Sequence, residues 1–189
     1  MSRAYRIKVR ESLRRVLCAH DRVGTQLELL EILPSEQMAG LLAEELKGRG
    51  FEEKGGALVR KQKGITVRVD AKTGSVTVEA ESSQEAAIEG EKAGRAYDDI
   101  GPHAKQVQKA LREQLRKDLE KQAEQQAAQL QSDVTDRLEQ ELGGLRRELD
   151  QAVNRVTAEA LKQKAAQLGQ IKEMTEDPQA GSLTIVVEV

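Results

Sequence analysis

Apolar and basic residues alternate at the start of the chain. In residues 5–10 every second position is apolar, and the positions between them are Arg6, Lys8 and Arg10. A period of two is typical of a β-strand with one apolar face and one charged face. A second apolar run at residues 27–33 predicts a partner strand, so that the first third of the chain begins with a long hairpin.

The next residues predict one helix followed by further strands. Ser35 is a suitable N-cap, the apolar residues after it have helical spacing, and Gly48 to Gly50 form a stop signal. Short alternating runs at 57–60, 65–69 and 75–80 predict strands joined by tight turns. Together these elements predict an α+β fold with a small, mainly antiparallel sheet.

A second helix is predicted for residues 82–101. Ser82 and Glu85 have the spacing of a capping box, and a boundary follows at residues 98–102. Small residues in this segment, including Gly90 and Gly94, would permit a close approach to a neighbouring backbone.

Residues 102–172 predict long helical structure, because an apolar residue recurs about every four positions without proline after Pro102. The spacing departs from the 3.5-residue repeat of a leucine zipper. Two arrangements fit: an antiparallel helical hairpin that turns at Gly143–Gly144, or one long helix or coiled coil that needs a partner. We favour the hairpin because it buries the apolar stripe within one chain. The candidate interaction residues of this stripe are Leu111, Leu115, Leu119, Leu130, Val134 and Leu138.

The last residues predict a terminal strand. Residues 182–189 are rich in β-branched side chains, and such a strand needs a sheet, so we expect it to return to the N-terminal sheet. The predicted division is a head (1–81 plus 182–189), a connecting helix (82–101), a long helical segment (102–172) and a linker (173–181).

Composition supports a small globular part joined to solvated helix. Charged residues make up 33% of the 189 positions, and only three residues are aromatic. The net charge of −2 gives no global attraction to nucleic acid or to an anionic membrane. No apolar run is long enough for a transmembrane span, and no signal peptide is apparent. With Cys18 as the single cysteine, these features favour the cytoplasm.

Candidate chemistry is sparse. The two histidines, His20 and His103, and Cys18 do not have the spacing of a zinc site. No glycine-rich phosphate loop or nucleophile elbow occurs. We therefore expect no catalytic residue, no metal and no cofactor, and we expect that the protein is not an enzyme.

Parts of the chain resemble a known family. Residues 158–187 run from a helix through Gly169 and an acidic turn to a β-branched strand, and the early helix at 41–46 is followed by Gly50 and Phe51. This order is similar to the conserved hypothetical family of chloroplast and cyanobacterial reading frames, whose bacterial relatives neighbour MoxR-type AAA ATPases. The resemblance covers about a third of the chain and implies an accessory role beside an AAA ATPase.

The functional hypothesis is a non-enzymatic adaptor or assembly subunit. Its long helices would contact a protein partner, such as an AAA ATPase or one of its cofactor proteins, or form a homo-oligomer. The alternative is a nucleic-acid-associated protein that binds phosphates through the basic face of Arg6, Lys8 and Arg10.

Overall fold

The computed structural model describes residues 5–97, 101–177 and 182–188. The predicted α+β class is confirmed, with a five-stranded antiparallel sheet and a second, two-stranded sheet. In chain order the elements are β1 (Tyr5–Gln26), α1 (Ser35–Gly48), β2 (Glu52–Lys54), β3 (Ala57–Gln62), β4 (Ile65–Val69), β5 (Ser75–Ala96), α2 (Pro102–Leu168), β6 (Gln170–Asp177) and β7 (Ser182–Glu188).

The chain divides into two compact units. The first, here called the ribbon unit, contains residues 1–21 and 81–136. The second, the sheet unit, contains residues 22–80 and 137–189. Strands β1 and β5 and helix α2 each contribute residues to both units.

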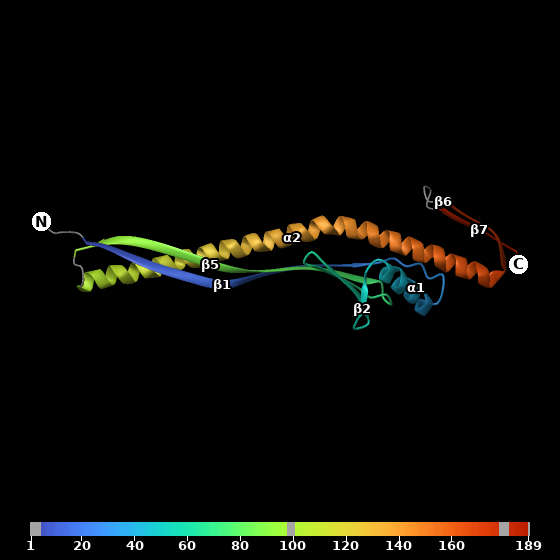
Figure 1. The fold of residues 1–189 in the computed structure, drawn as a ribbon, viewed down its shortest axis with the longest axis horizontal. Coiled ribbons are helices and arrows are strands. Elements are labelled where there is room, and N and C mark those ends of the chain that lie inside the picture. The colour runs from blue at the N-terminus through green and yellow to red at the C-terminus, as the bar shows by residue number, and fades with distance from the viewer. Residues whose placement is uncertain (1–4, 98–100, 178–181, 189) are drawn as a thin grey trace. The chain divides into compact units, whose positions relative to one another are not determined.

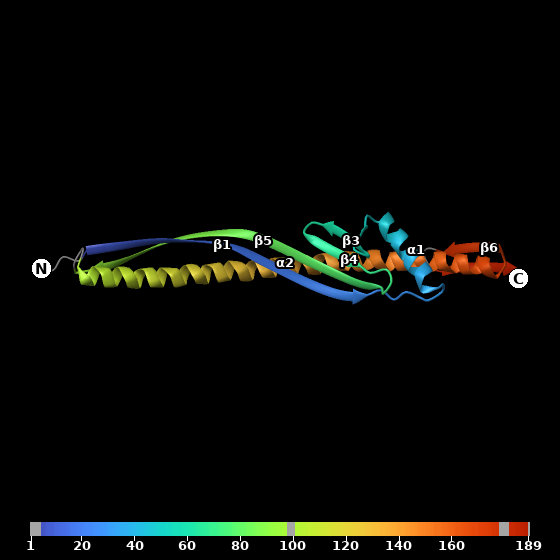
Figure 2. The ribbon, with the colours of Figure 1, turned by 90° about the horizontal axis from the view of Figure 1, so that it is seen from below.

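In the ribbon unit, β1 and β5 form a two-stranded layer along α2 (Figure 1). The two strands run antiparallel, which Figure 2 shows by their arrowheads. Their inward side chains pack with α2 in one apolar cluster, whose buried members are Val9, Leu17, Ala86, Ile88, Leu115, Leu119 and Ala123. The predicted first strand is thus confirmed, but its predicted partner at 27–33 is wrong: β1 itself continues to Gln26 and pairs with β5.

The sheet unit has a broader sheet. Strand β4 pairs with β3 from Ile65 to Val69 and with β5 from Val76 to Ala80, and β2 pairs with β3 at the edge. The predicted helix at Ser35–Gly48 is confirmed, and its buried residues are Met38, Leu42 and Leu46. Leu42, Leu46, Val69, Val76 and Val78 are among the largest fully buried side chains of the protein.

The predicted helix at 82–101 is wrong for the residues described up to Ala96, because β5 continues without interruption through this segment. Even-numbered positions such as Ala86 and Ile88 are buried, and most odd-numbered positions are exposed. Pairing with β1 and packing against α2 therefore override the local capping signal. The predicted boundary at 98–100 lies outside the described residues.

The predicted helical hairpin is also wrong. Helix α2 is continuous from Pro102 to Leu168 and passes through Gly143 and Gly144, neither of which has a positive φ. The prediction of a hairpin rests on the need to bury the apolar stripe within one chain. In the structure, buried stripe residues such as Leu115 and Leu119 lie in the cluster with β1 and β5, so this burial requires no turn.

The predicted return of the terminal strand to the N-terminal sheet is corrected as well. Strand β7 pairs with β6 in a separate two-stranded sheet, with Ile171 opposite Val187 and Met174 opposite Ile185. A partner close in sequence costs less loop entropy than a distant one. Residues 173–177 of the predicted linker belong to β6, and residues 178–181 lie outside the described residues. The predicted division into a head, a connecting segment, a long helical segment and a linker stays a prediction.

Candidate interaction surface

The predicted basic face is present on β1. Ile7 and Val9 point toward the core of the ribbon unit, whereas Arg6, Lys8 and Arg10 are exposed on the opposite face. The alternation inferred from residues 5–10 is therefore observed directly. Arg14 continues the same exposed series along the strand.

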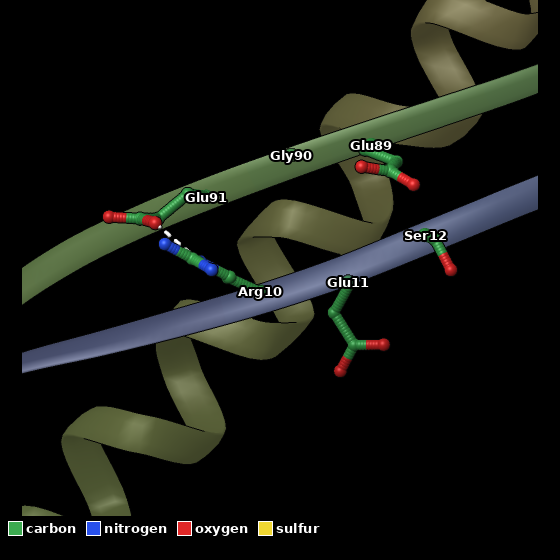
Figure 3. A pocket seen from close by; sticks show the side chains of 6 residues that line it. All are labelled: Arg10, Glu11, Ser12, Glu89, Gly90 and Glu91. Carbon is green, nitrogen blue, oxygen red and sulfur yellow. Dashed lines mark hydrogen bonds and ion pairs between the residues drawn. The ribbon is translucent and has the colours of Figure 1, made fainter.

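Strand β5 carries acidic residues on the same exposed face. Glu91 forms ion pairs with two residues of the basic face, at 3.1 Å from Lys8 Nζ to Oε1 and 2.6 Å from Arg10 Nε to Oε2. Figure 3 shows the Arg10 and Glu91 side chains meeting across the two strands, with α2 behind them. These hydrogen bonds, first from Arg10 and then from Lys8, lower the pKa of Glu91 from its ordinary value. Glu91 thus neutralises two of the three residues of the basic face. The basic face is therefore less available to phosphates than the sequence alone implies.

A shallow pocket of about 470 Å³ lies at this point, between Arg10–Ser12 of β1 and Glu89–Glu91 of β5 (Figure 3). Glu11, on the inner side of β1, lies 3.8 Å from the guanidinium of Arg112 on α2. The described residues contain no group of three or more histidine, cysteine or acidic side chains suited to a metal ion. The charged side chains that line the pocket include Arg10, Glu11 and Glu91, and these three form ion pairs within the protein.

The candidate interaction leucines face the protein's own core. Leu115 and Leu119 are only 3% exposed, and Leu111 and Leu130 pack against the same cluster. Val134 and Leu138 are also fully buried. None of the six candidate interaction residues forms a free docking surface in this structure. Their role in binding a partner stays a prediction, and it would require the strands that pack on α2 to move away from the helix.

Close approach of β5 to α2 depends on two glycines. A Cβ atom at Gly90 would lie 2.7 Å from Leu115 Cδ1, and one at Gly94 would lie 3.0 Å from Leu111 Cδ1. The neighbours of these two glycines are side chains of α2 and not a neighbouring backbone, and the element that carries the glycines is a strand. This contact holds the ribbon against one narrow stripe of the helix.

The sheet unit contains a polar cluster that the sequence did not suggest. Arg60 of β3 donates two hydrogen bonds to the carboxylate of Glu148 on α2, at 2.6 and 2.7 Å. Its guanidinium also lies 4.5 Å from the centre of the Phe51 ring, and Arg49 donates to the backbone oxygen of Glu148. The hydrogen bonds from Arg60 lower the pKa of Glu148 and raise the pKa of Arg60. The two partners are 88 residues apart, so no local spacing could have revealed them.

The sheet unit also has a groove of about 800 Å³ beside α2. Apolar side chains including Val23, Leu27, Leu142 and Val153 line it, and Arg146 and Asp150 lie among its polar residues. Cys18, in the ribbon unit, is exposed on β1 with a free thiol. Neither feature brings a nucleophile together with a base.

Comparison with known proteins identifies the class to which the chain belongs. The sequence model of the FtsH ternary system domain X5 matches residues 1–189, so the chain belongs to this family. Neither a curated protein nor a solved structure gives a significant match. The match does not show membership in the reading-frame family named from the sequence, but it confirms the association with an AAA system.

Family membership identifies the chain as an accessory component associated with an FtsH-type AAA protease system. Among the described residues, no helix combines the length and the apolar character needed to cross a lipid bilayer.

Proposed function

We propose that this protein is a non-enzymatic adaptor, located in the cytoplasm, that binds a protein component of its FtsH-associated system. The family match over residues 1–189 is the single observation that carries this proposal. The word "ternary" in the family description indicates a system of several components, in which a chain of this kind needs surfaces for other proteins.

The chemistry of the described residues supports a binding role. No polar or charged side chain among them is fully buried, so none lies in the desolvated setting that shifts a catalytic pKa strongly. The carboxylates whose pKa is lowered, such as Glu91 and Glu148, are those held by arginine or lysine in ion pairs. Such ion pairs hold strands and helix together and fix the positions of surface side chains.

The test is direct binding between the purified full chain and the FtsH-type protease of the same system. We expect a complex by analytical ultracentrifugation, and a change in the rate of ATP or substrate turnover when the chain is added. The full chain should show no turnover of either by itself. Absence of both a complex and a change in rate would contradict the adaptor role.

A matched pair of variants locates the binding surface. Arg14→Glu reverses an exposed charge on the ribbon unit, and Lys61→Glu reverses one on the sheet unit. Loss of protease binding in one variant alone assigns the contact to that unit, while the other variant serves as the control for folding and net charge.

A further inference from the structure

One long edge of the ribbon unit belongs to β1. This strand is the last in the order of the five-stranded sheet, so residues 5–16 have β5 on one side and no other strand of the described residues on the opposite side. That side, here called the open edge, presents backbone N–H and C=O groups that an added strand could use. Farther along β1, the backbone oxygen of His20 accepts a hydrogen bond from Gln131 of α2. The open edge is therefore limited to residues 5–16.

Bases follow the open edge on β1 itself. Residues 5–16 contain five bases and only one acid, Glu11. Glu91 of β5 pairs with two of these bases. Arg6 and Arg14 are exposed, and the part of the chain that the structure describes gives them no ion pair. The outer face of the edge thus keeps positive charge that no acid of the protein neutralises.

A second row of bases lies on the flank of α2 that borders the open edge. Arg112 marks this flank, because its Nε atom lies 3.8 Å from Oε1 of Glu11, whose side chain points away from β5 (Figure 3). Lys105, Lys109 and Arg116 lie seven and three residues before Arg112 and four residues after it, a spacing that places them on the same side of a helix. These three bases are exposed, and no described residue forms an ion pair with them.

The two rows of bases run side by side. Glu11 lies beside Arg112, and His20 is bonded to Gln131, so β1 and α2 run in the same direction between these two contacts. The nine strand residues between the contacts cover about 30 Å, and the nineteen helix residues cover about 28 Å. The open edge therefore has one row of bases on β1 and a second row beside it on α2.

This arrangement selects the chemistry of an added strand. Such a strand would lie about 4.8 Å from β1, next to the bases of β1 and to those on the flank of α2. Acidic side chains on it would meet bases on both of its faces, whereas basic side chains would be repelled. A second copy of β1 is disfavoured for the same reason, because it would bring its own bases to the contact.

Two other uses of these bases explain less of the arrangement. Charge on an edge strand can simply keep other strands away, but the bases of β1 would suffice for that purpose without the row on α2. Nucleic acid could place phosphates along both rows. It would leave the backbone groups of the open edge unused, and the chain has only three aromatic residues on which bases could stack.

We infer that the open edge of β1 binds an extended, acidic segment of a partner protein, which adds to the sheet as a further strand and places its carboxylates beside the bases of β1 and α2. In strand addition of this kind, main-chain hydrogen bonds supply affinity and side chains supply selectivity. The inference rests on the proposed adaptor role and names the surface and the kind of segment that this role would use.

Fluorescence anisotropy of a labelled peptide with the full chain provides the first test. The probe is a peptide of six glutamate–threonine repeats. The control peptide has proline in place of three of the threonines, which keeps the charge but removes N–H donors. The chain should bind the probe at least about tenfold more tightly than the control peptide, because the control loses main-chain hydrogen bonds. Added salt should weaken binding of the probe, since the attracting charges are exposed.

Three results would overturn the inference. The first is absence of binding to the probe. The second is equal binding of the two peptides, which would show attraction by charge without addition of a strand. The third is tighter binding of a short DNA duplex than of the probe at about 0.15 M salt, which would assign the bases to phosphates.

Charge reversal in each row provides the second test. One variant combines Arg6→Glu with Arg14→Glu on β1, and the other combines Lys109→Glu with Arg116→Glu on α2. Each variant should bind the probe at least about tenfold more weakly, because two attractive pairs become repulsive. If reversal of either row left binding unchanged, a strand held by both rows would be contradicted.

The control for net charge is Lys61→Glu with Arg68→Glu, which reverses two exposed bases of the sheet unit. This control should bind the probe like the wild type, and weakening as strong as in the other two variants would overturn the inference. Circular dichroism checks the fold of every variant. If a variant fails to fold, the comparison of the two peptides on the wild-type chain decides.

Failure of this inference is distinguishable from failure of the adaptor role. A chain that binds the protease but not the probe contradicts the acidic strand and leaves the adaptor role intact. A chain that binds the probe, but neither binds the protease nor changes its rate, contradicts the adaptor role while the open edge keeps its selectivity for an acidic strand.

Discussion

The ribbon unit and the sheet unit share two strands and one helix, yet they bury their apolar side chains in different ways. The sheet unit has strands on both sides of β4 and a second helix, with Leu42 and Leu46 fully buried. The ribbon unit has two strands and a single stripe of α2. An isolated two-stranded sheet is marginal in water unless a helix or further strands cover it. The same elements therefore give a self-sufficient core in one unit and an open, thin layer in the other.

The polar contacts differ in the same sense. In the sheet unit, Arg60 and Glu148 are largely shielded from solvent and join β3 to α2. In the ribbon unit, Lys8, Arg10 and Glu91 pair across an exposed face. A shielded ion pair contributes to stability where it is hydrogen-bonded on both sides, whereas an exposed pair contributes little and responds to salt.

The largest effect is expected from truncating the two cores. Leu46→Ala should lower the free energy of unfolding by about 2–5 kcal/mol, toward the upper end because the leucine is fully enclosed. Leu119→Ala should fall toward the lower end of that range, because a site covered by only two strands can collapse around the missing atoms. Chemical denaturation of both variants measures the difference. Equal losses would contradict the contrast between the units.

A smaller effect is expected from breaking the ion pair of the sheet unit. Glu148→Gln removes the charge that Arg60 binds and should cost about 1–2 kcal/mol, allowing for partial exposure to solvent. The matched variant Glu91→Gln should change the midpoint of unfolding less, because its partners are exposed. If Glu91→Gln proved the more destabilising of the two, the ribbon unit would depend on its surface pairs more than its geometry indicates.

The continuous helix predicts stabilisation by an alanine. Gly143→Ala places a Cβ where nothing lies within 4 Å and should raise stability by about 0.5–1 kcal/mol. Gly50→Ala is the matched control: it also has space for a Cβ, but its φ of +85° makes alanine strained, so stability should fall. Thermal melts of both variants measure these shifts. A loss of stability for Gly143→Ala would indicate a turn at this site.

The smallest effect concerns pH. The folded-state pKa of Glu148 is held below its ordinary value of 4.5, chiefly by hydrogen bonds from Arg60. A carboxyl of this kind binds its proton more readily in the unfolded chain. Its contribution to the free energy of unfolding is therefore complete above about pH 4.5 and is lost as the pH falls through the lowered pKa. Urea denaturation at pH 7 and at pH 3 should therefore show that the difference between wild type and Glu148→Gln shrinks in acid. A difference independent of pH would contradict this source of stability.

Part of this structure could be predicted from the sequence. The alternation at residues 5–10, the helix at Ser35–Gly48 and the strands at 65–69 and 75–80 follow from local periodicity, which survives in the fold. The continuation of β5 through Gly90 and the passage of α2 through Gly143 could not be obtained in this way, since local capping and glycine signals favoured other structures. Both depend on contacts between β5 and α2. The pair Arg60–Glu148 likewise arises only when distant segments meet.

Hydrogen exchange of backbone amides in the dilute full chain tests the contrast between the units most directly. The account predicts stronger protection for residues 57–62 and 65–69 of the sheet unit than for residues 8–20 and 82–94 of the ribbon unit, because local opening costs least where few strands and few buried side chains resist it. Equal protection in the two units, or stronger protection in the ribbon unit at a concentration where the chain is monomeric, would contradict the account.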